Sequence, residues 1–430
     1  MRNSSANSRF SFLKPLAIGK KCIIISRCPL ASTINRKKIC SMIRISIKDL
    51  PKPSVLLEPL VRLVQKNAVM FVALFVALIT MLIVPPDRQY LGYFDFKTLT
   101  CLFCVLAVVC ALKNIQFFYI LAKKIVQLFK NARLAVLALV YITFIGSMLI
   151  ANDMALLTFL PLGFLVLNTT GERKYMAFTY IMQNIAANLG GMLTPFGNPQ
   201  NLYLYSYFNI PTMEFMQIMA PPFVLAVVLI TLCCVIFVKP EPLSMPDEPV
   251  RLPAGRASLY LLLFALAIAI VFRGIPYWIG LAIIPVVLFF ADRKALRMVD
   301  YPLLLTFVFF FIFAGNMARI EPVRRFFSML LEKSTLIFSV ASCQVISNVP
   351  SAILLSQFTD NYRELLLGVN IGGVGTLIAS LASLITFRDY TNRNPGKTGY
   401  YMVLFTAFNF AFLILLTGFV VLGEKIALWL

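Results

Sequence analysis

The feature that most constrains this fold is a series of apolar runs, each about as long as a bilayer is thick. A helix needs about 20 predominantly apolar residues to cross the hydrocarbon core, because each residue adds only about 1.5 Å of rise. Runs of this kind lie at residues 67–85, 95–112, 212–238, 256–272, 275–291, 300–318 and 399–422. The chain is 60% hydrophobic and 13% charged, which excludes an ordinary soluble domain. We therefore expect an all-α polytopic membrane protein.

The chain is also strongly basic, with 39 Lys and Arg against 18 Asp and Glu. Most basic residues lie in short segments between apolar runs, as expected of cytoplasmic loops beside anionic lipid. We therefore expect membrane lipid, and no nucleic acid, as a partner. The chain has no histidine, and the Cys101-x-x-Cys104 pair has no second pair to complete a metal site. We predict no resident metal, no cofactor and no enzymatic activity.

The first 66 residues form a basic segment that carries 14 Lys or Arg and two acidic residues. This much charge cannot cross a bilayer, and no apolar core and cleavage site follow it in the order of a secretory signal. We predict a cytoplasmic N-terminal segment over residues 1–66, with Met42 as an alternative start. The protein is then a multi-pass component of the cell (inner) membrane with its N-terminus in the cytoplasm.

Three further regions combine apolar runs with polar residues and Gly/Pro breaks, at residues 133–168, 175–208 and 334–387. The clearest break, at residues 188–202, reads NLGGMLTPFGNPQNL. Irregular backbone survives at membrane depth only inside protein or beside a polar cavity, because unpaired backbone groups are costly in lipid. Pro195 and Pro199 each remove a helical donor, and Asn198 is expected to cap the helix that Pro199 begins. We predict two half-helices that face a binding site, with a ligand-free proline kink as the alternative.

An internal repeat relates this break to a second one. Three elements recur in the same order: a basic amphipathic helix, a hairpin with a polar tip, and the break. The matched segments are 115–130 with 318–333, 147–162 with 343–358, and 188–202 with 370–384. The break segments share five of fifteen residues, where chance gives roughly one. The hairpin segments align Asn152 with Asn348. We infer an internal duplication.

The number of crossings before each hairpin predicts that the two repeats have opposite orientations in the membrane. Two crossings precede the first hairpin, which then enters from the cytoplasm, whereas three precede the second, which enters from outside. This count treats residues 115–130 as an interfacial helix, and reading them as a crossing would remove the inversion. We predict about 9–11 transmembrane helices in two inverted repeats, each with a re-entrant hairpin and a broken helix. The repeats cover residues 67–238 and 256–430, and a proline-rich linker over residues 239–255 joins them.

Polar residues at the hairpin tips and breaks are the candidate binding residues. An intramembrane carboxylate is costly, so Asp153 is a candidate for binding a cation or a proton, with helix capping as its alternative role. The second tip, around Asn348, has no acidic residue. Such a neutral site suits an anion, or a cation that binds together with an anion. Amide oxygens such as those of Asn198 and Asn201 are suited to holding a cation.

The tips and breaks resemble those of the ion transporter superfamily, which includes divalent-anion/sodium symporters, citrate transporters, arsenite/antimonite permeases and sodium/proton antiporters. IANDMALLTFLPL and LTPFGNPQNL are most similar to citrate-transporter-like and arsenite-permease-like members, and the resemblance covers residues 67–425. It implies a homodimer in which basic arm helices carry a mobile domain by elevator-type motion. The substrate- and ion-binding residues that it implies are Asn152, Asp153, Thr194, Gly197, Asn198, Asn201, Ser347, Asn348, Thr376, Ser380 and Ser383. A coupling Na⁺ would lie at Asn152, Asp153, Asn198 and Asn348.

The sequence therefore predicts a secondary active transporter for a small anion, a di- or tricarboxylate or an inorganic oxyanion, coupled to sodium ions or protons. A sodium/proton antiporter or an arsenite/antimonite efflux permease on the same fold is the alternative, with Asp153 as the titrating group. Dicarboxylate symporters carry Ser-Asn-Thr at both tips. Here the tips read Ala-Asn-Asp and Ser-Asn-Val, and the second break, TLIASLAS, has no proline. Substrate identity, direction and stoichiometry stay open.

Overall fold

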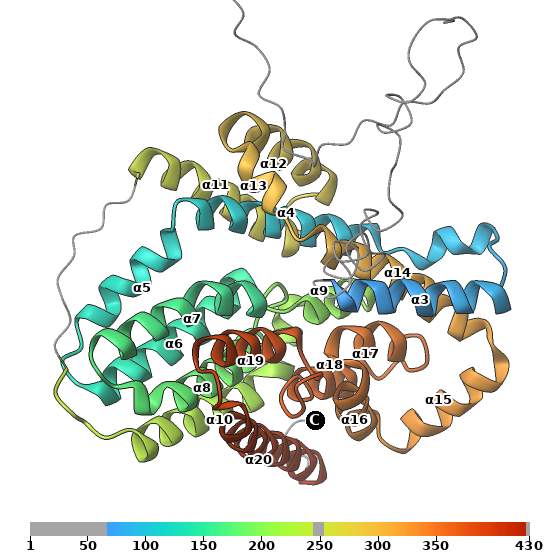
Figure 1. Ribbon diagram of the computed structural model, residues 1–430. Helices are drawn as coiled ribbons and strands as arrows, with labels where there is room; N and C mark the ends of the chain where they lie inside the picture. Colours follow the sequence, from blue (N-terminus) through green and yellow to red (C-terminus); the bar gives the residue numbers. More distant parts are fainter. Residues whose placement is uncertain (1–66, 244–252, 427–430) are drawn as a thin grey trace, which may run out of the picture. The chain divides into compact units, whose positions relative to one another are not determined.

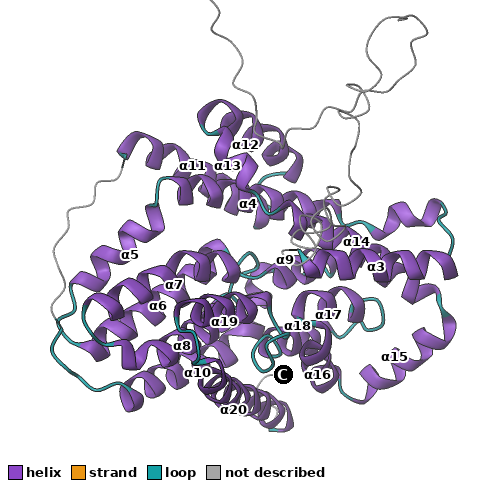
Figure 2. Ribbon diagram, viewed as in Figure 1, coloured by secondary structure: helices purple, strands orange, loops and turns teal. Residues whose placement is uncertain are grey.

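The computed structural model describes residues 67–243 and 253–426, which belong to one compact unit. The predicted N-terminal segment and residues 244–252 of the linker lie outside the described residues. The described chain is almost wholly helical, and its β-structure is an isolated bridge between Asn131 and Pro242 (Figures 1 and 2). The all-α class is therefore confirmed.

Each of the apolar runs predicted to cross the bilayer forms a helix. These helices are α3 (Ala68–Ile83), α4 (Phe96–Asn114), α10 (Thr212–Phe237), α11 (Ala254–Val271), α12 (Tyr277–Ala291), α14 (Tyr301–Arg319) and α20 (Thr398–Lys425). Within the described residues, six helices are long and apolar enough to cross a membrane, namely α4, α6 (Ala132–Ile150), α7 (Asn152–Thr169), α10, α14 and α20. The short elements η2 (Arg88–Tyr93) and α13 (Arg293–Met298) lie in the connections.

The regions with embedded breaks form helical hairpins and interrupted helices. In the first half these are α6 (Ala132–Ile150) with α7 (Asn152–Thr169), and, after η3 (Arg173–Tyr175), α8 (Met176–Gly190) with α9 (Pro199–Tyr207). In the second half they are α16 (Thr335–Ile346) with α17 (Asn348–Leu355), and α18 (Tyr362–Ile371) with α19 (Leu381–Arg393). The helix interruptions thus fall where glycine and proline gather in the first half and at TLIASLAS in the second.

A short helix precedes each hairpin, at α5 (Phe117–Gln127) and α15 (Glu321–Lys333). The 11 residues of α5 rise only about 16 Å, which is half of a bilayer core. Helix α5 begins directly after Gln116, whose left-handed backbone (φ 55°) turns the chain away from α4. The segment near residues 115–130 is thus too short to be a crossing, as the predicted inversion requires.

The helices pack in groups. Helix α3 lies along α14, and α4 packs against α11, α12 and α13 (Figure 1). Each hairpin packs on the first half of the interrupted helix that follows it, α6 on α8 and α16 on α18. Helix α9 joins the two halves by packing against α17 and α18. The two hairpin tips and the two breaks are thereby brought to the same region.

The start of the linker is tied to the first half. The Leu243 amide donates to the Lys130 carbonyl at 2.8 Å, and the Ala132 amide donates to the Glu241 carbonyl at 2.8 Å. The Lys174 ammonium also pairs with the Glu241 carboxylate, and this hydrogen bond lowers the pKa of Glu241. Lys130, before the first hairpin, and Lys174, after it, therefore both contact the start of the linker.

Candidate functional site

Both hairpin tips turn on a single residue with left-handed backbone. Ala151 has φ 65° and Ser347 has φ 78°. In each tip the next residue is an asparagine whose Oδ1 accepts the following backbone N–H at 2.9 Å, from Asp153 in the first tip and Val349 in the second. The alignment of Asn152 with Asn348 therefore pairs residues with the same local geometry.

The tip geometry at Ala151 predicts a stabilising substitution. An alanine at φ 65° and ψ 152° is strained by about 1–3 kcal/mol, whereas glycine adopts this conformation freely. After loss of the buried methyl group, Ala151→Gly is expected to raise the free energy of unfolding by about 1 kcal/mol. The control Ala155→Gly, at a buried helical position in α7, is expected to lower it by about 1–2 kcal/mol. Thermal unfolding in detergent measures both, and a lower midpoint for Ala151→Gly would contradict the strain.

The breaks are fastened to the hairpins by matching hydrogen bonds. Thr194 Oγ1 donates to the Met148 carbonyl at 2.8 Å, and Thr376 Oγ1 donates to the Gln344 carbonyl at 3.0 Å. Each accepting carbonyl lies four residues before the tip asparagine. The two threonines, predicted as binding residues, thus hold the tips in place in both halves.

Buried amide side chains of the two halves form one network. Asn152 Nδ2 donates to Asn188 Oδ1 at 3.2 Å, and Asn198 Nδ2 donates to the Asn188 carbonyl at 3.2 Å and to Asn370 Oδ1 at 3.3 Å. Asn370 Nδ2 donates in turn to Asn201 Oδ1 at 2.6 Å. All five side chains are buried. The network fixes the first tip and both breaks relative to one another.

The other predicted break residues close the breaks from within. Asn201 Nδ2 donates to the carbonyls of Gly191 and Met192 at 3.1 and 3.2 Å. A Cβ on Gly197 would lie 2.3 Å from the Gly191 carbonyl oxygen, so the two sides of this break touch. In the second half, Ser380 caps α19 by accepting the Ser383 amide at 3.2 Å. These residues therefore stabilise the two breaks.

Asn198 is the N-cap residue of α9 and Pro199 is its first helical residue, as predicted, but the Asn198 side chain makes no capping hydrogen bond. Its amide group instead serves two buried acceptors, the Asn188 carbonyl and Asn370 Oδ1. Asn198 Oδ1 is buried and has no hydrogen-bond partner within the described chain. Tertiary contacts with the second half thus outweigh the local capping preference of asparagine.

Asp153 lies in the first turn of α7, after the N-cap residue Ala151, so its own side chain does not occupy the capping position. The backbone amide of Asp153 is satisfied by Asn152 Oδ1. Its own Oδ1 atom is buried and lacks a hydrogen-bond partner in the described part of the chain. The geometry therefore gives no support to the capping role and leaves a carboxylate oxygen available to a cation or a proton.

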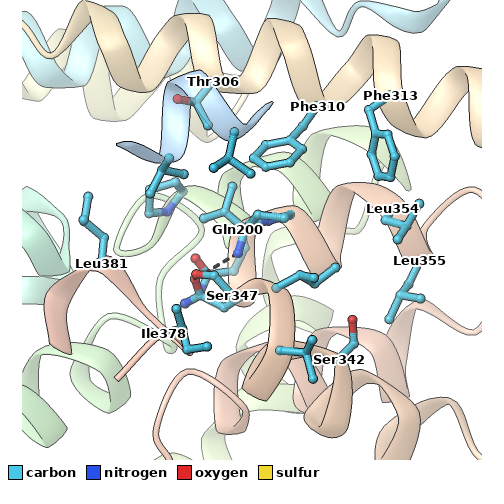
Figure 3. A pocket seen from close by; sticks show the side chains of 18 of the residues that line it. Gln200, Thr306, Phe310, Phe313, Ser342, Ser347, Leu354, Leu355, Ile378 and Leu381 are labelled. Atoms are coloured by element: carbon cyan, nitrogen blue, oxygen red, sulfur yellow. Dashed lines mark hydrogen bonds between the residues drawn. The ribbon is translucent and has the colours of Figure 1, made fainter. Parts of the chain in front are cut away.

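The hairpin tips face a cavity of about 810 Å³. Helices α3 and α14 form one wall, and Figure 3 shows Phe310 and Phe313 of α14 across from Ser347 and Ile378. Of the predicted residues, those that line the cavity are Asn152, Asp153, Ser347 and Asn348. Those that lie outside its lining are Thr194, Gly197, Asn198, Asn201, Thr376, Ser380 and Ser383.

Four helices begin at this cavity. The lining includes the first residues of α7, α9, α17 and α19, which are Asn152, Pro199, Asn348 and Leu381. Each start carries the positive end of a helix dipole. Some first-turn N–H groups are already engaged, since those of Asp153 and Val349 donate to Asn152 Oδ1 and Asn348 Oδ1, and Pro199 has none. Among the described lining residues none is Lys or Arg, and Asp153 is the one charged side chain. The positive potential at the tips therefore comes from backbone.

Sequence reasoning missed several residues of the site. The repeat alignment pairs Asn188 with Asn370 as identical residues. It did not show that both residues join the amide network. Asn409 accepts from Asn184 at 3.4 Å, and its position as a polar residue inside an apolar crossing was a usable signal. Gln200, in the cavity lining, had no signal beyond its place in the break.

Comparison with known proteins matches most of the chain. A family model described as citrate transporter matches residues 55–362. An uncharacterized transporter, MJ0456 of Methanocaldococcus jannaschii, is 32% identical over 320 residues, which are 74% of this chain and 88% of that protein. The inner membrane protein YbiR of Escherichia coli is 30% identical over 286 residues, which are 64% of this chain and 75% of that protein. The family match includes both hairpin tips.

Proposed function

Because this chain belongs to the citrate transporter family, we propose that it carries a small carboxylate or inorganic oxyanion by symport with sodium ions or protons. Family membership itself makes it a secondary anion transporter in a membrane. The observation that carries the finer proposal is the convergence of four helix N-termini on one cavity.

Helix N-termini are suited to binding an anionic cargo, because each of them carries only a partial positive charge. Each N-terminus is equivalent to about half a positive charge, so together they favour an anionic group on the bound cargo. Backbone N–H groups bind phosphate and carboxylate groups in this way in many proteins, and broken helices do so in transporters. The amides of Asn152 and Asn348 add polar contacts at the same tips.

Asp153 supplies the link between anion and coupling cation. Its carboxylate faces the cavity in which the anion would bind, and like charges at this depth repel strongly. The cavity lining offers no Lys or Arg within the described residues that would offset this repulsion. A proton or Na⁺ on Asp153 would remove this repulsion, so cation and anion would bind together.

The position of the cavity supports elevator-type motion. One wall belongs to α3 and α14, whereas the tips and breaks supply the other. The short helices α5 and α15 connect α4 and α14 to the two hairpins. A movement of the hairpins and interrupted helices along α3 and α14, hinged at these arms, would carry the bound anion across the membrane. The homodimer, the cytoplasmic N-terminus and the inverted repeats belong to this proposal.

Ligand binding to purified protein tests the proposal. A ligand that binds only the folded state raises the thermal unfolding midpoint by mass action. Di- and tricarboxylates, inorganic oxyanions and arsenite are scanned with sodium or potassium at several pH values. A shift by an anion that requires sodium or low pH supports symport. Shifts from sodium or pH alone, with no effect of any anion, favour the sodium/proton antiporter.

Replacing Asp153 with asparagine is expected to uncouple transport. Asparagine keeps the size of the side chain but binds no proton, and its neutral amide does not repel the anion. We expect exchange of anion across proteoliposomes to persist, while accumulation driven by a sodium or pH gradient falls at least about tenfold, the loss of about 1.4 kcal/mol of coupling. The control is Asp87→Asn, in the exposed η2 connection. Wild-type accumulation by Asp153→Asn would remove Asp153 from the coupling site.

A further inference from the structure

The cavity has an uneven distribution of polar and apolar surface. The wall opposite the tips is apolar, and its apolar members from α3 and α14 are Ala68, Val69, Val72, Val76, Leu303, Phe310, Phe313 and Met317. Thr306 interrupts this wall, but its hydroxyl donates to the Pro302 carbonyl at 2.7 Å. Helices α15 and α16 add apolar residues such as Phe327 and Phe338, and also Ser342, whose hydroxyl is hydrogen-bonded to the Ser351 hydroxyl at 2.8 Å. Three sides of the cavity therefore offer little to a charged group.

Apolar side chains also border the second tip itself. Val345 and Ile346 precede Ser347, and their side chains are 71% and 39% exposed. Ile378 in the second break is 53% exposed, and Figure 3 shows it near Ser347 on the side of the cavity across from Phe310. All three residues line the cavity. Apolar surface of this kind gains free energy when an apolar ligand covers it.

The polar groups gather at one end. They are the four helix N-termini with the side chains of Asn152, Asp153, Gln200, Ser347 and Asn348, whereas the hydroxyls of Thr306 and Ser342 lie apart from them (Figure 3). A tricarboxylate spreads its charges over several ends, and only one end could meet these groups. Its other carboxylates would lie against Phe310, Phe313 and Met317 without a basic partner in the described lining, which is strongly unfavourable for a charge removed from water.

We propose that the preferred cargo is an amphiphilic carboxylate, with one anionic head and an aromatic or branched aliphatic body. The head binds at the helix N-termini, and the body lies against Phe313 and Val345. A volume of about 810 Å³ is ample for such a body, since ligand cavities span about 300–1,000 Å³. This inference rests on the proposed function, anion transport through this cavity, and specifies its substrate class.

The test compares four carboxylates on the full chain in detergent: phenylacetate, 4-methylvalerate, succinate and citrate. Thermal unfolding gives relative affinities, and uptake into proteoliposomes shows which of them are carried. We expect phenylacetate and 4-methylvalerate to bind at least about tenfold more tightly than succinate or citrate, a difference of about 1.4 kcal/mol. Measurements are made with sodium and at low pH, so that Asp153 is neutralised in either case.

Variants of the apolar surface test the mode of binding. Phe313→Ala and Val345→Ser are expected to weaken phenylacetate binding about tenfold or more and to leave succinate binding within about twofold. Val345 is largely exposed, so its substitution is compatible with folding. Leu305→Ala is the matched control, because Leu305 lies on α14, is 45% exposed and is not part of the cavity lining.

The outcomes separate this inference from the proposed function. Citrate or succinate binding as tightly as phenylacetate, with no change of ratio in Phe313→Ala or Val345→Ser, would overturn the substrate class while leaving an anion transporter. Binding of sodium or protons without any of the four anions would overturn both. Uptake of phenylacetate that falls in the two variants and not in Leu305→Ala supports the amphiphilic carboxylate.

Discussion

Replacing Gly190 with alanine is expected to prevent the protein from folding, whereas Gly418→Ala is expected to be tolerated. A Cβ on Gly190 would lie 2.2 Å from the Phe144 carbonyl oxygen and 2.6 Å from Ser147 Oγ, where α8 crosses α6. Backbone of α6 cannot withdraw without displacing the tip that it carries. We expect a loss of at least about 4 kcal/mol, which belongs to the exceptional range for a single substitution.

Gly418 is a matched control because it also lies in a long apolar helix, α20, yet nothing lies within 4 Å of its added Cβ. Alanine there removes a weak helix former and is expected to be neutral or stabilising by up to about 1 kcal/mol. Yield of monodisperse protein and the thermal unfolding midpoint compare the two variants. Equal behaviour of Gly190→Ala and Gly418→Ala would refute the close crossing of α6 and α8.

The same contact recurs in the second half. A Cβ on Gly372 would lie 2.8 Å from Cys343 Cβ, and Cys343 holds the position in its hairpin that Ser147 holds in the first. Gly190 and Gly372 were aligned from the sequence, so the duplicated glycine is explained by a duplicated helix crossing. We accordingly expect Gly372→Ala to be destabilising as well.

The local features of this fold were accessible from sequence. Apolar length determined the crossings, and glycine with proline determined where the first broken helix stops and restarts. The asparagines at positions 152 and 348 marked the tips because a polar residue in an apolar run needs a partner. The family was identified from these motifs, and the comparisons confirm the citrate-transporter-like assignment.

The partners of the polar side chains were not accessible in this way. Asn198 is 172 residues from Asn370, and no local pattern indicates that its amide turns to that residue and away from the α9 cap. The apolar wall of the cavity was also missed, because residues such as Phe310 look like ordinary lipid-facing positions in an apolar run. The sequence thus located the polar tips and breaks of the site, but it could not show that an apolar wall of α3 and α14 lies opposite them.

Replacing Asn201 with alanine is expected to destabilise the fold before it affects transport. Asn201 Nδ2 donates to the carbonyls of Gly191, Met192 and Thr194, at 3.1, 3.2 and 3.4 Å. Asn201 Oδ1 accepts from Asn370 at 2.6 Å. A buried polar group that loses its partner costs about 1–3 kcal/mol, and Asn201→Ala leaves several such groups, so we expect a loss of about 3–5 kcal/mol.

A double-mutant cycle with Asn370 distinguishes this structural role from direct ion binding. Asn370→Ala removes the amide that donates to Asn201 Oδ1. We therefore expect Asn370→Ala to cost at least about 1 kcal/mol less in the Asn201→Ala background than in the parent protein. The control Asn361→Ala removes an exposed cap of α18 and is expected to cost about 1 kcal/mol with no coupling to Asn201. Unfolding midpoints in detergent with and without sodium are measured for the parent, the three single variants and the two double variants that contain Asn201→Ala. If Asn201→Ala instead folded with the parent's midpoint and lost only its response to sodium, Asn201 would be an ion ligand and not the residue that closes the break.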